Sequence, residues 1–389
     1  MKNEVWVDEL LSKKGETGQK RFIRVFTGSG GKLSIDGREY LNFSSNDYLN
    51  LANHPDVIEG SRILLEKYGA GATSSRLIAG TLDVHEELEQ ALASFKGYPC
   101  AVLFGTGYLA NAGAITSLVG RDDHIFLDRF AHASIVDAAV TSRSRIHRFR
   151  HNDCEHLNEL LNGTKGGKRL IVVESLYSMD GDIAPLQDIV SVAERHDAMI
   201  MVDEAHATGV LGPGGRGLIC EFGLTNRINV SMGTLGKSFG GYGGFTACSQ
   251  RIRDLCVNQA RSLIYTTAPP PAAVGAALGA LNIVAQEPDL GSTLLRRAKM
   301  FRKRLLEAGY TIPGGNSQII PVIVGDNHVT MSFAERLRTS GIIVNGIRPP
   351  TVPEGTSRLR FSVTLAHEEA DLEHAASTIE KTGTLLGVI

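Results

Sequence analysis

The sequence predicts an α/β protein: a large domain with a mostly parallel sheet flanked by helices, and a smaller α+β domain. From about Leu82, helical segments alternate with short apolar segments, which is the pattern of a parallel sheet covered by helices. After the proline run at Ala268–Pro271, long charged helices alternate with strands. A chain of 389 residues is long enough for two domains. We expect an N-terminal segment, 1–45, that joins the small domain, a large domain over 46–275, and a C-terminal small domain over 276–389.

The alternation begins with its clearest helix and strand. Thr81 can cap a helix that Gly97 can end, and CAVLF at Cys100–Phe104 follows as a buried strand. One face of this helix is apolar and carries Val84, Leu88, Leu92 and Phe95. A tight turn, Gly105-Thr-Gly107, follows the strand, and a helix over Leu109–Leu118 comes next.

Further strands are predicted at HIFLD (124–128), LIVVES (170–175) and AMIMVDEAH (198–206). Each of these apolar runs ends in polar residues. In open α/β sheets the ligand lies outside the carboxyl ends of the strands. The polar endings therefore indicate one crevice for the chemistry.

Composition excludes several classes of protein. Lys+Arg 40 against Asp+Glu 42 gives a net charge of −2, without a long block of like charge, so nucleic acid is not expected as a partner. The five cysteines are scattered and never spaced as CxxC, which argues against a disulfide framework and a metal site and fits a cytoplasmic protein. The first residues are charged and no apolar run is long enough to span a bilayer, so neither a signal peptide nor a membrane segment is expected.

Two short segments carry the strongest chemical signal. Asp203-Glu-Ala-His206 stands at a strand end, and Thr234-Leu-Gly-Lys237 precedes the glycine-rich SFGGYGG. Alone, the aspartate is typical of a helix cap and the lysine of a solvated loop. Pyridoxal 5′-phosphate (PLP) requires a lysine, a carboxylate for its ring nitrogen, and donors for its phosphate. The chain offers all three at strand ends.

With these segments the sequence resembles the α-oxoamine synthases, a family of fold-type-I PLP enzymes, over nearly its whole length. The resemblance rests on an ordered set of motifs: NFSSNDYL from Asn42, GAGATSSRLIAGT from Gly69, HASIVDAA from His132, SMDGD from Ser178, VDEAHATG from Val202 and TLGKSFG from Thr234. It implies a large domain with a seven-stranded sheet. Arg76 in SSRLIAG departs from some biotin-pathway members, which have histidine there, so this loop does not separate the subfamilies.

The resemblance also implies roles at the cofactor. Lys237 would form the Schiff base, and Asp203 would face the pyridine nitrogen. His206 would lie near the ring hydroxyl, with Ser178 close by. His132 would stack on the ring and orient the acyl substrate, although His132 and His206 are each also compatible with an ordinary capping or buried histidine. The phosphate contacts would come from Gly107, Tyr108, Thr234 and Thr266.

Substrate contacts are implied at four further residues. Arg360 in RLRFS would bind the α-carboxylate of the amino acid, because guanidinium and carboxylate form a two-pronged pair, and Arg358 competes for this role. Asn46, in the first motif, and Thr351, in IRPPTVPEG, would contact substrate. So would Arg21, unless a slip of one residue in the register places Lys20 there.

The segment from Ile347 is similar to that of the biotin-pathway members, which implies L-alanine and a pimeloyl thioester as substrates. Coenzyme A and acyl carrier protein both stay open as the acyl carrier. Glycine-using relatives, such as glycine C-acetyltransferase or 5-aminolaevulinate synthase, are the main alternative, followed by an aminotransferase and a non-catalytic PLP-binding protein. The resemblance further implies a homodimer in which the Thr266-Thr267 segment reaches the neighbour's phosphate.

Overall fold

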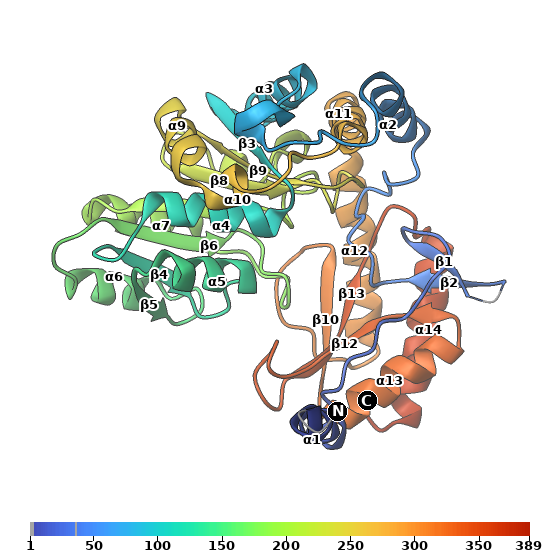
Figure 1. Ribbon diagram of the computed structural model, residues 1–389. Coiled ribbons are helices and arrows are strands. Elements are labelled where there is room, and N and C mark those ends of the chain that lie inside the picture. Colours follow the sequence, from blue (N-terminus) through green and yellow to red (C-terminus); the bar gives the residue numbers. More distant parts are fainter. Residues whose placement is uncertain (1–3, 36) are drawn as a thin grey trace. The chain divides into compact units, whose positions relative to one another are not determined.

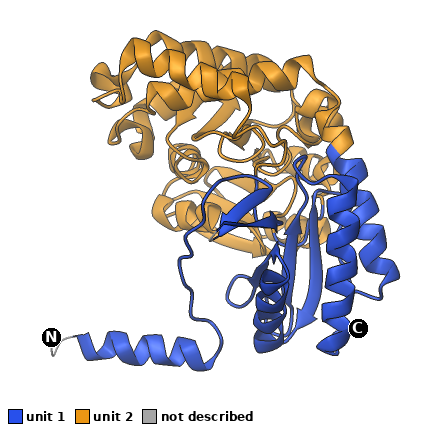
Figure 2. Ribbon diagram, turned by 90° about the vertical axis from the view of Figure 1, so that its right-hand side faces the viewer, with its two compact units in different colours: residues 1–46, 179–182, 294–389 blue, residues 47–178, 183–293 orange. Residues whose placement is uncertain are grey.

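The computed structural model describes residues 4–35 and 37–389, and the chain divides into two compact units (Figure 2). The larger unit holds residues 47–178 and 183–293, and the smaller unit holds residues 1–46, 179–182 and 294–389. The domain limits expected after residues 45 and 275 stay a prediction. The compact units themselves divide after residues 46 and 293.

A seven-stranded sheet forms the centre of the larger unit, in the order β3-β9-β8-β7-β6-β4-β5 (Figure 1). Its strands are β3 (Cys100–Phe104), β4 (His124–Asp128), β5 (Arg145–Phe149), β6 (Arg169–Glu174), β7 (Met199–Asp203), β8 (Val230–Thr234) and β9 (Gly244–Cys248). Within this sheet β9 runs antiparallel to β3 and β8, and the other neighbouring pairs are parallel. The expected mostly parallel sheet is confirmed.

Helices flank this sheet. They are α2 (Pro55–Tyr68), η2 (Arg76–Gly80), α3 (Asp83–Lys96), α4 (Gly107–Leu118), α5 (Ala133–Ser142), α6 (Cys154–Asn162), α7 (Leu186–Arg195), η3 (Pro213–Gly215), α8 (Leu218–Glu221), α9 (Gln250–Gln259), α10 (Arg261–Ile264) and α11 (Pro271–Gln286). A buried apolar cluster joins α4, α5, α9 and α10 to strands of the sheet, and it includes Ile115, Ile135, Cys256, Val172 and Met201. This packing fixes where α4 and α5 begin, next to the carboxyl ends of the strands.

The helix α11 packs along α2, and this contact keeps it in the larger unit. A Cβ atom built on Gly60 would lie 2.5 Å from the carbonyl oxygen of Gly275, so any larger residue there would push the two helices apart. Such close backbone contact between helices cannot be read from the apolar pattern of the sequence.

The first predicted helix and strand are found with a correction at the helix start. Gly97 ends α3 in the left-handed conformation at φ 75°, and Cys100–Phe104 is β3, as expected. The N-cap residue, however, is Leu82 and not Thr81. The Thr81 hydroxyl donates to the Arg76 carbonyl oxygen at 2.6 Å, and the His85 ring accepts the Leu82 N–H at 3.0 Å instead.

The smaller unit is α+β and contains two three-stranded sheets, β1-β2-β11 and β10-β13-β12. Its strands are β1 (Lys32–Ile35), β2 (Arg38–Asn42), β10 (Ile319–Gly325), β11 (Ile342–Ile343), β12 (Asn345–Ile347) and β13 (Ser357–Ser362), and its helices are α1 (Val5–Glu16), most of α12 (Leu290–Glu307), α13 (Asn327–Thr339) and α14 (Glu369–Leu385). Phe43 stacks between Phe301 and His367 in its core, at centroid distances of 5.2 and 4.3 Å. Among the described residues, no helix has the length and apolar character needed to cross a membrane.

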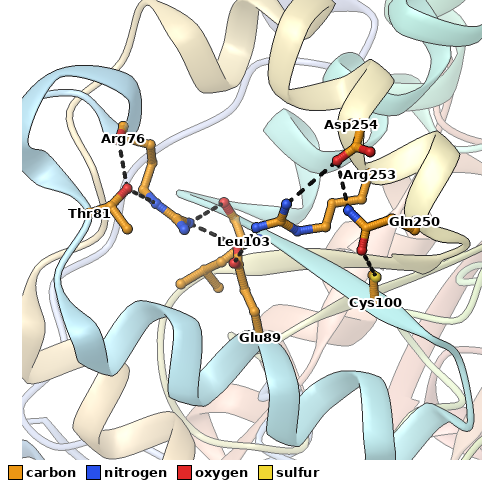
Figure 3. Close-up of polar contacts among 8 residues, drawn as sticks. All are labelled: Arg76, Thr81, Glu89, Cys100, Leu103, Gln250, Arg253 and Asp254. Carbon is orange, nitrogen blue, oxygen red and sulfur yellow. Dashed lines mark hydrogen bonds and ion pairs between the residues drawn. The ribbon is translucent and has the colours of Figure 1, made fainter.

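A buried ion pair ties η2 to α3 in the larger unit (Figure 3). Arg76 Nη1 lies 2.9 Å from Glu89 Oε1, and the two side chains are only 9% and 7% exposed. Arg76 Nε also donates to Thr81 Oγ1 at 2.9 Å, and Glu89 accepts the backbone N–H of Leu103 at 2.7 Å. Arg76 therefore holds the loop, α3 and β3 together.

Replacing Glu89 with Gln should lower the free energy of unfolding by about 3–5 kcal/mol, because the buried Arg76 guanidinium loses its carboxylate. Urea denaturation followed by circular dichroism measures the change. Glu194→Gln is the matched control, since Glu194 pairs with Arg227 on the exposed surface of the same unit and its loss should change stability little. Equal effects of the two substitutions would contradict the structural role of the buried pair.

Candidate active site

Two carboxyl groups lie side by side at the ends of β6 and β7, where Glu174 and Asp203 are register partners. Both are buried, at 3% and 5% exposure. Asp203 Oδ1 accepts the backbone N–H of Ala205 at 2.9 Å, and Oδ2 accepts the Asn111 side-chain amide of α4 at 2.8 Å. The position and direction of the Asp203 carboxylate are therefore fixed by donors from two elements.

The two carboxyl groups differ in their surroundings. Burial raises the pKa of Glu174 to about 8, and the Asp203 carboxylate adds to this rise while Lys237 opposes it. Glu174 Oε1 accepts the backbone N–H of His132 at 2.7 Å. Glu174 therefore keeps its proton near neutral pH beside Asp203, whose two oxygens both accept hydrogen bonds.

Lys237, His206 and Tyr48 form a hydrogen-bonded row. Lys237, half-buried in the loop between β8 and β9, has its Nζ atom 2.6 Å from His206 Nε2. The other ring nitrogen, Nδ1, lies 2.7 Å from the hydroxyl oxygen of Tyr48, a fully buried residue. An ammonium group at Lys237 would donate to Nε2 and leave the ring proton on Nδ1, where it would be donated to Tyr48. The structure thus brings together the lysine and histidine that the sequence singled out.

The turn that begins α4 lies against the end of β8. A Cβ atom built on Gly107 would lie 3.3 Å from Thr234 Cβ, so glycine permits this close approach. Thr234 Oγ1 donates to the Gly243 carbonyl oxygen at 3.0 Å, and the exposed Tyr108 hydroxyl donates to Asp137 at 2.6 Å. The N-terminus of a 12-residue helix beside a threonine hydroxyl suits a phosphate group.

His132 is the N-cap of α5, so the capping interpretation of this residue is correct as far as it goes. Its Nδ1 atom lies 2.8 Å from Ser134 Oγ and accepts the Ser134 N–H at 3.2 Å. Desolvation and the Lys237 charge lower the pKa of His132, against the opposite effect of Asp203, and the residue as a whole is exposed. Ser178 is buried in the loop after β6, and Thr266 lies half-buried in a bend after α10.

Of the five predicted substrate residues, His132 lies in the larger unit and the other four lie in the smaller unit, where they form two pairs. Arg21 Nη2 donates to Thr351 Oγ1 at 3.2 Å, whereas the Lys20 ammonium lies over the Phe22 ring. Arg360 Nη1 donates to Ser362 Oγ at 2.9 Å and, at 3.4 Å, to Asn46 Oδ1.

The rival arginine, Arg358, is engaged elsewhere. Its guanidinium forms an ion pair with Asp180, and it also donates to the Thr356 carbonyl oxygen at 3.0 Å. This pairing is internal to the smaller unit and favours a structural role for Arg358. It leaves Arg360 as the better candidate for a carboxylate ligand.

The sequence analysis did not single out Glu174, Asn111, Ser134 or Tyr48 as site residues. Glu174 lies next to the end of the predicted strand LIVVES, while Tyr48 stands in the motif NFSSNDYL and Ser134 in HASIVDAA, so all three had a signal in the sequence. Asn111 lies inside an apolar helical segment, where a single polar residue is ordinary. Only its three-dimensional contact with Asp203 identifies it.

Comparisons with known proteins agree on one family. The sequence model of aminotransferase class I and II matches residues 38–379. The 8-amino-7-oxononanoate synthase of Citrifermentans bemidjiense is 44% identical over 99% of this chain and 100% of its own length. A serine palmitoyltransferase structure with a PLP internal aldimine has a TM-score of 0.94 at 32% identity and covers 100% of this chain and 99% of its own. An 8-amino-7-oxononanoate synthase structure from Francisella tularensis has a TM-score of 0.76 at 28% identity, covering 89% and 98%.

The raised pKa of Glu174 predicts a pH-dependent stability of the cofactor-free protein. Glu174 is protonated up to about pH 8 in the folded state but ionises near its ordinary value of 4.5 when unfolded. The folded state therefore binds more protons between these values, so stability falls as pH rises through this window, by at most about 1.4 kcal/mol per pH unit.

Glu174→Gln removes this dependence. The unfolding free energy of the variant minus that of the wild type should therefore rise as pH increases from about 5 to 8. Urea denaturation at a series of pH values measures the difference, with Glu194→Gln as the exposed control. A difference that stays constant across the window would show that Glu174 is ionised in the folded protein.

Proposed function

This chain belongs to the aminotransferase class I and II family, and from that premise we propose that it is an 8-amino-7-oxononanoate synthase. The reaction is a decarboxylative condensation of L-alanine with a pimeloyl thioester in biotin biosynthesis. The observation that carries this conclusion is the set of relatives with that name, which are 41–44% identical over nearly the full length of the chain. The enzyme is a PLP-dependent acyltransferase.

The residues at the strand ends fit PLP in chemistry and in space. Lys237 would carry the cofactor covalently, and Asp203 offers a buried carboxylate for the ring nitrogen. Gly107 leaves room beside Thr234 that a Cβ atom would fill, and with Tyr108 it begins the helix that would receive the phosphate. When bound, PLP stabilises negative charge at the α-carbon of the amino acid.

Proton transfer falls to the row formed by Lys237, His206 and Tyr48. The amine of Lys237 is the group that would remove the Cα proton of alanine and later return a proton to carbon. His206 holds Nζ at 2.6 Å, and Tyr48 holds the opposite side of the imidazole ring at 2.7 Å. His206 would also lie near the cofactor's ring hydroxyl, with Ser178 close by. The row would orient the Lys237 amine for this proton transfer.

Substrate recognition is assigned to the smaller unit and to His132. Arg360 would bind the α-carboxylate of alanine through its guanidinium group, with Asn46 beside it. Arg21 and Thr351, already in contact, would bind the acyl substrate. His132 would stack on the cofactor and orient the thioester.

The proposal extends to the oligomeric state, the acyl carrier and the cellular compartment of the enzyme. We propose a homodimer in which Thr266 reaches the phosphate bound by the neighbouring subunit, as the resemblance to the α-oxoamine synthases implies. The acyl carrier is coenzyme A or acyl carrier protein. The five free cysteines fit a reducing cytoplasm.

A substrate panel tests the reaction. Purified holoenzyme should turn over alanine with a pimeloyl thioester faster than any combination of glycine with acetyl or succinyl thioesters, and both pimeloyl carriers are included. Mass spectrometry of the product gives the answer directly. Preference for glycine would assign the chain to a different member of the family.

Lys237→Ala should lower kcat by on the order of 10³-fold or more and abolish the absorption band of the lysine-bound cofactor, because both the covalent link and the base are lost. The circular dichroism spectrum should stay that of a folded protein. Full turnover by this variant would refute the assignment.

Arg360→Lys should raise the KM for alanine about 10- to 100-fold with a smaller change in kcat, because an ammonium group cannot form the two-pronged carboxylate pair. Arg358→Lys is the comparison, and it should mainly lower stability, because the ion pair with Asp180 is weakened. Steady-state kinetics and thermal denaturation separate the two effects. The opposite pattern would exchange the roles of the two arginines.

A further inference from the structure

Four side chains of the larger unit form a continuous hydrogen-bonded path that crosses from β7 through α4 to the start of α5. Asn111 Nδ2 lies 2.8 Å from Asp203 Oδ2 and 2.9 Å from Ser134 Oγ. Ser134 Oγ in turn lies 2.8 Å from His132 Nδ1. Asn111 and Ser134 are almost fully buried, at 0% and 1% exposure, so water does not compete for the bonds that join Asn111 to Asp203 and Ser134, whereas His132 at the end of the path is exposed.

The direction of each hydrogen bond in this path is determined by chemistry. An ionised carboxylate only accepts, so the Asn111 amide must present its NH₂ group to Asp203. The second amide hydrogen of the same nitrogen is then directed to Ser134 Oγ. Because this oxygen accepts from Asn111, the single hydroxyl hydrogen of Ser134 is available for His132 Nδ1.

His132 is consequently held in one protonation form. Its Nδ1 atom accepts from the Ser134 hydroxyl and also from the Ser134 backbone N–H at 3.2 Å, so this nitrogen carries no proton. A neutral ring then has its proton on Nε2. The backbone of the same residue is anchored separately, since the His132 N–H donates to Glu174. The lowered pKa of His132, caused by desolvation and the Lys237 charge, agrees with a neutral ring.

We propose that Asn111 and Ser134 are positioning residues that connect Asp203 to His132 and fix His132 as the neutral tautomer with its proton on Nε2. This inference rests on the proposed function for its consequence, which is that Nε2–H can donate to the carbonyl oxygen of the acyl thioester. The same path gives Asp203 a permanent donor at Oδ2. One hydrogen-bonded unit thus serves both the cofactor side and the acyl side of the reaction.

The test removes the hydroxyl group and leaves the backbone N–H in place. In Ser134→Ala, the only remaining donor to His132 Nδ1 in this path is the backbone N–H of residue 134, at 3.2 Å. We therefore expect a mixture of tautomers or a protonated ring. The ¹⁵N NMR signals of the imidazole, recorded on cofactor-free protein and on holoenzyme and assigned with a His132→Gln variant, report the form directly. Ser134→Thr, which keeps a hydroxyl, should restore the wild-type signals.

The kinetic readout separates positioning from a structural role. Ser134→Ala should lower kcat/KM for the pimeloyl thioester about 10- to 100-fold, equivalent to roughly 1.4–2.8 kcal/mol. The KM for alanine should change little. Ser117→Ala is the matched control, since Ser117 is a buried serine of α4 whose hydroxyl donates to the Gly113 carbonyl oxygen, and its loss should affect neither readout.

Asn111→Leu provides a second variant of similar volume that removes both donors at once, and the His132 signals should respond as in Ser134→Ala. An unchanged single tautomer with full kcat/KM in folded Ser134→Ala and Asn111→Leu would overturn the proposal. Failure of the proposed function is distinguishable from this outcome. An inactive wild type with alanine and pimeloyl thioester would reject the function, while the NMR signals would still decide the tautomer.

Discussion

Two neighbouring carboxyl groups at the buried ends of β6 and β7 impose the main electrostatic constraint on the larger unit. If Glu174 and Asp203 were both ionised there, their repulsion in a poorly solvated environment would be costly. The fold treats them differently: Asp203 receives hydrogen bonds on both oxygens, whereas Glu174 receives one from the His132 backbone and keeps its proton. This asymmetry lets a single negative charge remain where the proposed chemistry needs it. It also places His132 in the field of Asp203, and Lys237 acts on both His132 and Glu174.

The sequence predicted the framework of the larger unit well because its information is local. Short apolar runs ending in polar residues indicated the strands, and the carboxyl ends of parallel strands necessarily meet at one edge of the sheet. Asp203 was found for this reason. Glu174 stood in an equivalent position, but its role depends on lying beside Asp203, and strand order is not visible in the linear pattern.

Other features depend on side-chain contacts that the sequence pattern did not reveal. Thr81 had the right residue type for a helix cap, yet Arg76 engages its hydroxyl, and the cap falls on Leu82. Arg76 stood out in the sequence only as a departure from some biotin-pathway members, whereas its environment shows a buried ion pair with Glu89. For Arg358 and Arg360, alternation along one strand offered no means of choosing between them. The ion pair between Asp180 and Arg358 distinguishes the two arginines, because Arg358 already has a carboxylate partner.

The burial of Asn111 shows what the hydrogen-bonded path costs. This residue sits on α4 among Ala110, Ala114 and Ile115, where an apolar side chain would fill the same space without any polar group to satisfy. Its Nδ2 atom is fully used by Asp203 and Ser134, but Oδ1 is buried without a hydrogen-bond partner among the described residues. A buried carbonyl oxygen of this kind is destabilising by about 1–3 kcal/mol. Stability alone therefore favours a different residue at position 111, and what the amide provides instead is a fixed donor to Asp203 and, through Ser134, a fixed proton position on His132.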